Sequence, residues 1–212
     1  MSDKRSQGRP CRGGNEVGSD RIIESLREML RSRRSDCTCR KSLAEFAGVT
    51  PALITYYFPH KDTLIEEATK PIIEDYARQL RSILSHEEAH DVKLHKVITL
   101  LVGCYERDAG ILDAYSELAR QKGEALKPNY VTMMTENLAE FFGDWFNQGT
   151  MQAHHPAMLQ GALWGMCQFV AQVNLARELC GTDENLIPDD LDRVTAVYCL
   201  MSGGLDRLRI HA

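Results

Sequence analysis

Apolar residues recur along most of the chain at intervals of three and four positions, which is the period of an amphipathic helix. The runs lie near residues 20–33, 42–47, 51–58, 61–84, 92–106, 110–122, 131–146, 156–179 and 189–208. No stretch alternates apolar and polar residues with the period of a β-strand, and no internal repeat is present. The pattern predicts an all-α protein.

The stretch 42–64, SLAEFAGVTPALITYYFPHKDTL, combines two short helical runs with a sharp turn. Gly48 suits the positive φ that ends a helix abruptly, and Thr50 followed by Pro51 is a typical helix start. Two short helices joined by such a turn form a helix-turn-helix. The apolar stripe of the first helix is Leu43, Ala44, Phe46 and Ala47.

The second of these helices has an apolar side and a solvent side. Leu53, Ile54 and Phe58 are expected to face the first helix. Ala52, Thr55, Tyr56 and Tyr57 are expected to point to solvent. Pro51, Ala52, Thr55 and Tyr56 would then enter the major groove of DNA, where Tyr56 contacts either a base edge or the sugar-phosphate backbone.

This stretch resembles the DNA-binding signature of the tetracycline-repressor (TetR) family of transcription regulators. The matching residues are Leu43-Ala44, Ala47-Gly48-Val49, Thr50-Pro51, Tyr57-Phe58, Lys61 and Leu64, and the resemblance extends over about residues 20–67. It implies that Lys61 contacts a DNA phosphate and that Cys39, Arg40 and Lys41 lie near DNA. One position departs from the pattern, because relatives carry Tyr where this chain has Thr55. The expected DNA-binding residues are Arg40, Lys41, Thr50, Pro51, Ala52, Thr55, Tyr56, Tyr57 and Lys61.

The domain organisation follows from the composition and the resemblance together. Residues 1–19 mix Gly, Ser, Arg and Lys, which indicates a disordered basic tail. Residues 20–67 form the expected three-helix DNA-binding domain, and residues 68–212 the helical effector-binding and dimerisation domain. The resemblance also implies that an effector moves the helix over residues 61–84 and so changes the separation of two DNA-binding heads.

The charge is distributed unevenly along the chain. The net charge is −5, but residues 1–61 contain twelve Lys or Arg and seven Asp or Glu, a net +5. The remaining residues therefore carry a net −10. A basic head on an acidic body directs the head to DNA and keeps the body away from it.

The cysteines and histidines predict neither disulfides nor a metal site. The seven cysteines have no framework spacing, and the first residues lack the apolar segment of a secretory signal. A reduced, cytoplasmic protein is expected. His86 and His90 are four residues apart but have no cluster of carboxylates near them in the sequence, so we interpret them as solvated side chains.

Methionine and aromatic residues in the body suggest a pocket for an apolar or aromatic effector. Most of them are expected to be ordinary core, and some to line the pocket. The candidate pocket residues are Met134, Leu138, Phe141, Trp145 and Trp164.

The run 156–179 is apolar on nearly every side, which requires cover on every side. A second subunit can supply that cover, in agreement with relatives whose last two long helices form a four-helix dimer interface; other helices of the same chain are the alternative. Gly161 and Gly165 would allow close approach of a helix. The expected dimer-interface residues are Gly161, Gly165, Phe169, Val173, Val197 and Met201.

No motif of a nucleophile elbow, a phosphate-binding loop or a metalloprotease is present, and no cofactor is expected. The resemblance implies a homodimeric, ligand-responsive repressor that leaves a palindromic operator when a small molecule binds. Two alternatives stay open: a ligand-independent DNA-binding protein, and an enzyme with an accessory DNA-binding head.

Overall fold

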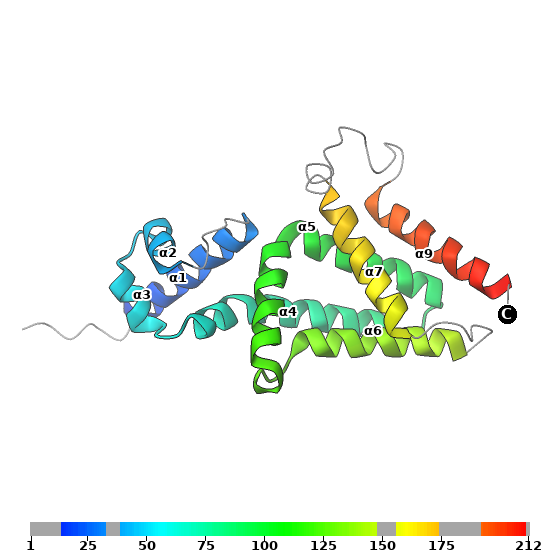
Figure 1. Ribbon diagram of the computed structural model, residues 1–212, viewed down its shortest axis with the longest axis horizontal. Helices are drawn as coiled ribbons and strands as arrows, with labels where there is room; N and C mark the ends of the chain where they lie inside the picture. Colours follow the sequence, from blue (N-terminus) through cyan, green and yellow to red (C-terminus); the bar gives the residue numbers. More distant parts are fainter. Residues whose placement is uncertain (1–13, 33–38, 148–155, 174–191, 211–212) are drawn as a thin grey trace, which may run out of the picture.

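The computed structural model describes residues 14–32, 39–147, 156–173 and 192–210 of the 212-residue chain, and these ranges contain helices and no strand. A small head of three helices is joined by α4 to a larger helical body (Figure 1). Within the described ranges no helix is both long and apolar enough to cross a bilayer. The elements are α1 (Gly14–Arg31), α2 (Arg40–Ala47), α3 (Pro51–Tyr57), α4 (Lys61–Ser85), α5 (His90–Lys122), the 3-10 turn η1 (Gly123–Ala125), α6 (Tyr130–Asn147), α7 (Pro156–Ala171) and α9 (Arg193–Ile210).

The predicted turn chemistry of the helix-turn-helix is confirmed. Gly48 ends α2 with φ 64° and ψ 38°, and its backbone N–H donates back to the last turn of that helix. Thr50 caps α3, since its hydroxyl oxygen accepts a hydrogen bond from the backbone N–H of Leu53 at 3.2 Å. Ile54 and Phe58 are buried against α1 and α2. The cap and the turn therefore fix the direction in which α3 leaves the head.

The first helix starts earlier than predicted. It begins at Gly14 rather than near Asp20, so residues 14–19 belong to α1 and not to a disordered tail. Within this extension Gly18 lies against α3, since a Cβ on Gly18 would approach the Tyr57 hydroxyl oxygen to 3.0 Å. The remainder of the predicted tail, residues 1–13, lies outside the described residues.

Helix α4 runs without a break from the head into the body, across the domain boundary expected after residue 67. Pro71 lies inside it on the exposed side, while Ile73, Tyr76 and Leu80 are buried on the other. One continuous helix therefore connects the head to the body.

Helix α5 contains the break that the sequence placed between residues 106 and 110. The backbone is non-helical at Asp108 (φ −131°, ψ 27°), and the two halves of α5 run in different directions in Figure 1. The second half packs beside α1 and α4, and the first half beside α7 and α9. Asp108 thus stands at the corner between the head and the body.

The rest of the body is made of α6, α7 and α9. Helix α6 packs on α4 and α7, while α9 packs on α5 and α7. Helix α7 ends at Ala171 rather than reaching Leu179, and residues 174–191 lie outside the described residues. The end of α7 has a tertiary cap: the Arg193 guanidinium donates to the Ala171 carbonyl oxygen at 3.5 Å and pairs with Glu106 at 2.6 Å.

Candidate functional site

The outer face of α3 is exposed. Pro51, Ala52, Thr55 and Tyr56 lie on this face, and 68% of Tyr56 is accessible. The Thr55 hydroxyl donates to the Pro51 carbonyl oxygen at 3.1 Å, which leaves its methyl group and the lone pairs of its oxygen for a partner. Because Ile54 and Phe58 anchor the opposite side, α3 presents these side chains from a rigid base.

Two exposed lysines belong to the helices before and after α3. Lys61 is the first residue of α4, Lys41 the second of α2, and both are exposed, as is Thr50. In the part of the chain that the structure describes, neither lysine forms an ion pair within 4.0 Å. Both ammonium groups are therefore available to an anion.

Arg40 has a different environment from the other predicted DNA-binding residues. Its guanidinium donates to the carbonyl oxygens of Pro59, at 2.5 Å, and Phe58, at 3.4 Å. These bonds satisfy carbonyl groups that follow α3 and hold the start of α4 against α2. Arg40 is thus a positioning residue of this turn, and its contact with a phosphate stays a prediction.

Two aromatic residues of the head are placed differently from the prediction. Phe46 was expected in the apolar stripe of α2 but is 42% exposed, because the buried side of this short helix is made of Leu43, Ala44 and Ala47. Tyr57 was expected to face solvent but is half-buried and packs against the head core beside Gly18. The sequence period alone does not separate adjacent positions on such short helices.

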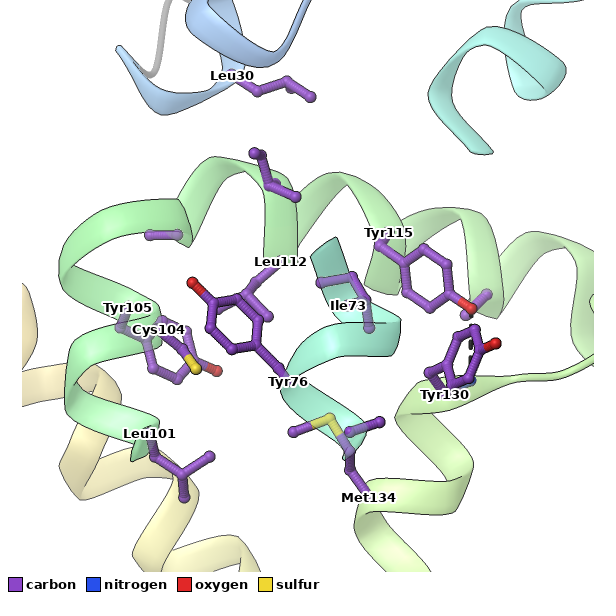
Figure 2. Close-up of a cluster of buried hydrophobic side chains, with 14 of the residues drawn as sticks. Leu30, Ile73, Tyr76, Leu101, Cys104, Tyr105, Leu112, Tyr115, Tyr130 and Met134 are labelled. Atoms are coloured by element: carbon purple, nitrogen blue, oxygen red, sulfur yellow. Dashed lines mark hydrogen bonds between the residues drawn. The ribbon is translucent and has the colours of Figure 1, made fainter. Parts of the chain in front are cut away.

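The predicted effector residues divide into core and wall. Met134 and Leu138 are 2% and 0% exposed and belong to the central cluster around Tyr76, which Figure 2 shows with Met134 beside it. Trp164 is half-buried, and its ring meets the Tyr105 ring edge-on at 6.4 Å. The Trp145 side chain lies outside the described residues. Met134 and Leu138 therefore act as core packing in this conformation.

A pocket of about 260 Å³ opens between the end of α4, the start of α5 and α6. Phe141 is the predicted effector residue that lines it, and its ring stacks on His90 at 5.7 Å. The wall mixes aromatic, basic and acidic groups. Its residues are Arg81, Leu84, Ser85, His90, Lys93, Asn137, Glu140, Phe141 and Asp144.

One side of α7, which we call the α7 outer face, consists of small and apolar residues that are exposed. It is made of Met158, Gly161, Ala162, Gly165 and Phe169, with Met158 65% and Phe169 48% exposed. A Cβ on Gly161 or Gly165 would meet no heavy atom of the described residues within 4 Å. Leu200 of α9 is likewise 64% exposed.

Half of the predicted dimer-interface residues are not on the surface. Val173, Val197 and Met201 are buried within the chain, at 8%, 0% and 5% exposure. Helix α9 packs against α5 and α7 of its own subunit, and this packing covers Val197 and Met201, which are four residues apart on one side of it. These three residues are therefore covered within their own subunit, while Gly161, Gly165 and Phe169 are accessible to a second one.

The described ranges contain two buried thiols and no cluster of metal ligands. These ranges contain no group of three His, Cys, Asp or Glu side chains that could hold a metal ion. Burial raises the pKa of the Cys104 thiol, and likewise that of Cys167, to about 12. Thiols with such pKa values are protonated at neutral pH and are poor nucleophiles.

No protein-family model matches the chain, and no curated protein matches it either. Solved structures do match. AibR in complex with isovaleryl coenzyme A and operator DNA is 16% identical with a TM-score of 0.64, over 88% of this chain and 97% of that chain. FadR from Bacillus subtilis in complex with stearoyl-CoA is 14% identical with a TM-score of 0.58, over 90% and 97%.

A protein described as a putative TetR-family transcriptional regulator from Mesorhizobium loti is 17% identical with a TM-score of 0.55, over 94% of this chain and 97% of that chain. These matches extend over head and body together. At such identities they establish the fold. The chain has the fold of the TetR-family transcriptional regulators.

Proposed function

We propose that the protein is a sequence-specific DNA-binding transcriptional regulator, a repressor that a small molecule releases from a palindromic operator. The observation that carries this proposal is the exposed face of α3 on a rigidly capped helix-turn-helix, between Lys41 and Lys61. The operator DNA named for AibR, a protein of the same fold, supports it. In this function Pro51, Ala52, Thr55 and Tyr56 enter the major groove, while Lys41, Thr50 and Lys61 contact phosphates.

The functional unit that we propose is a homodimer joined through the α7 outer face. An apolar face of this kind favours a partner, and a second copy of the chain supplies the same face by symmetry. Gly161 and Gly165 lie four residues apart and leave space for close helix approach. A dimer also places two α3 helices in successive major grooves, as a palindromic operator requires.

For the effector we propose acyl-coenzyme A thioesters as the class to test first. AibR and the Bacillus subtilis FadR, which share the fold, were solved with isovaleryl coenzyme A and stearoyl-CoA. The pocket beside Phe141 also offers basic groups, Arg81, His90 and Lys93, next to a flat aromatic surface. Phosphates and an adenine ring suit those groups. Release of operator by an acyl-CoA, but not by free coenzyme A or by the fatty acid alone, would support this class.

The two alternatives make different predictions in the same assays. A ligand-independent DNA-binding protein would bind operator equally with every compound tested. An enzyme with a DNA-binding head would consume a bound compound, whereas a regulator returns it unchanged. The amount of intact acyl-CoA that remains after prolonged incubation with the protein distinguishes the enzyme from the regulator.

The first test is selection of bound fragments from the genome of the source organism. The proposed function requires a small set of fragments that share an inverted repeat and bind tightly at physiological salt. Uniform weak recovery of the whole genome would contradict sequence-specific regulation. The genes next to the selected fragments would also suggest the effector.

Lys61→Ala is expected to weaken binding about equally on operator and on random DNA. The ammonium group contacts a phosphate, which carries no base information. The slope of the logarithm of the binding constant against the logarithm of salt concentration should fall by roughly 1 per lost contact. Lys127→Ala, at an exposed lysine of the body, is the matched control and should leave the slope unchanged. Unchanged affinity of Lys61→Ala at several salt concentrations would rule out the contact.

Tyr56→Ala is expected to relax the preference at one operator position by roughly 1–3 kcal/mol if the ring contacts a base edge or a thymine methyl group. Affinities for a set of operators that differ singly at each position measure this preference. Tyr56→Phe, which removes only the hydroxyl, distinguishes a hydrogen bond from an apolar contact. A loss of equal size on every operator would instead place the ring on the sugar-phosphate backbone.

A further inference from the structure

Asp108 interrupts α5 at the corner between the head and the body, and its carboxylate is almost completely buried, with 7% of the side chain accessible. A buried carboxylate requires hydrogen-bond partners or a cation. Its partners come from two other helices, one of the head and one that links the head to the body.

Each carboxylate oxygen of Asp108 accepts from a different helix. The Arg31 Nε, in the last turn of α1, donates to Oδ1 at 2.7 Å. The Tyr76 hydroxyl of α4 donates to Oδ2. Burial and this hydrogen bond raise the pKa of Tyr76, so its hydroxyl keeps the proton that it donates. One carboxylate therefore joins α1, α4 and α5.

Close backbone packing holds the same corner. A Cβ on Gly110, two residues after Asp108, would overlap the carbonyl oxygen of Leu30 in the last turn of α1. Leu30 itself is 3% exposed and lies over the corner of α5 in Figure 2. The last turn of α1 is thus fixed to α5 by a close backbone contact at Gly110 and an ion pair at Asp108.

The other side of this corner faces the body. Tyr105, three residues before Asp108, is buried, and its ring meets Trp164 of α7. In Figure 2 Tyr76 lies between Cys104 and Tyr105 of the first half of α5 and Leu112 of the second half. A change in the packing of α7 on α5 therefore acts on the turn of helix that ends at Asp108.

We propose that Asp108 is the joint that fixes the angle between head and body, and that movement of the body reaches α1 through the Asp108–Arg31 pair. This inference rests on the proposed function, because it concerns how two heads are held at one separation on an operator. Asp108 is a positioning residue and does not touch DNA. The head is already connected to the body by α4. The joint adds a second connection, between α1 and α5.

Loosening such a joint should change which operator spacing the protein prefers, whereas a simple loss of stability should not. Two heads held rigidly bind an operator with the matching spacer much better than one with a base pair added or removed. When the joint is loosened, each head can rock to meet either spacing, and the preference for one spacer becomes smaller. A variant that is merely less stable contains fewer active molecules but keeps the same preference.

The experiment compares affinities of full-length protein variants for the selected operator and for versions with one base pair inserted or deleted at its centre. Arg31→Gln and Asp108→Asn should each lower the spacer preference by about tenfold, as expected for loss of one charged hydrogen bond. The double variant should lower it by less than the two single effects combined, because both changes remove the same Arg31–Asp108 bond. Arg31→Lys, which keeps the charge, should restore part of it.

Arg120→Gln is the matched control, since Arg120 forms an exposed pair with Glu117, and both residues belong to the second half of α5. It should keep the spacer preference of the wild type. Circular dichroism verifies that each variant is folded. Because 40% of the Arg31 side chain is exposed, Arg31→Gln tests the joint even if Asp108→Asn does not fold.

Each result has one meaning. Reduced spacer preference in Arg31→Gln, with preference kept in Arg120→Gln, supports the joint. If the wild type prefers one spacer and Arg31→Gln shows the same preference, the joint is overturned and the proposed function stands. A wild type that binds all spacers alike also overturns it. A wild type with no specific operator overturns the proposed function itself.

Discussion

Gly165→Leu is expected to leave the subunit folded and to separate the dimer. The position is exposed on α7, and a Cβ there meets no described atom within 4 Å, so leucine fits the single subunit. Leucine also favours a helix by up to about 1 kcal/mol over glycine. At a close helix contact between subunits, however, overpacking costs roughly 1–3 kcal/mol, and symmetry makes it occur twice. The dimer dissociation constant should rise roughly 30-fold or more.

Sedimentation at several concentrations measures this constant, and circular dichroism verifies that helix is retained. Thr132→Leu, an exposed position on α6, is the control for an added apolar side chain and should remain a dimer. Operator affinity should fall together with dimerisation, because one head alone reads half of the palindrome. A Gly165→Leu protein that stays dimeric would place the interface elsewhere, and a monomeric wild type that binds operator tightly would remove the need for one.

Gly110→Ala is expected to destabilise the protein by about 2 kcal/mol or more. The added Cβ would overlap the carbonyl oxygen of Leu30, which is backbone and cannot rotate away, so α1 and α5 must separate. Separation also stretches the neighbouring Arg31–Asp108 pair. The free energy of unfolding from urea titration measures the loss, and operator affinity should fall with it, since the head is displaced from the body.

Gly103→Ala provides the matched control on the same helix. Its Cβ would meet the guanidinium of Arg107 at 2.9 Å, which is the far end of an exposed side chain beside the Tyr76 ring and not backbone, so it can shift. The substitution should then be neutral or stabilise the protein by up to about 1 kcal/mol, the ordinary gain of alanine over glycine in a helix. Equal stability effects at positions 103 and 110 would contradict the close contact between α1 and α5.

The candidate DNA-binding face could be predicted almost completely from the sequence. Its signals are local: the positive φ of Gly48, the Thr50 cap and the fixed φ of Pro51 act within one or two turns of the chain. The burial of Ile54 and the exposure of Tyr56 follow from these signals and from helical spacing. Tyr57 was the exception, since α1 extends far enough to cover it.

The body was predicted less well, because its helices offer apolar residues on several sides. Periodicity indicates that Val197 and Met201 are buried, but not whether the same subunit or a second one covers them. The structure places them against α5 and α7, and leaves Gly165 and Phe169 uncovered. Met134 and Leu138 were candidates for a pocket wall in a set expected to be mostly core, and both lie in the core.

The sequence by itself determined the all-α class, the helix-turn-helix and the break in α5, because each depends on caps, turns and periods between near neighbours in the chain. Only the tertiary structure decided which faces are covered and which partners Asp108 has, since Arg31 and Tyr76 lie 77 and 32 residues away in the chain. Contacts at such separations depend on how whole helices pack, and the spacing of residues along one helix does not encode that packing.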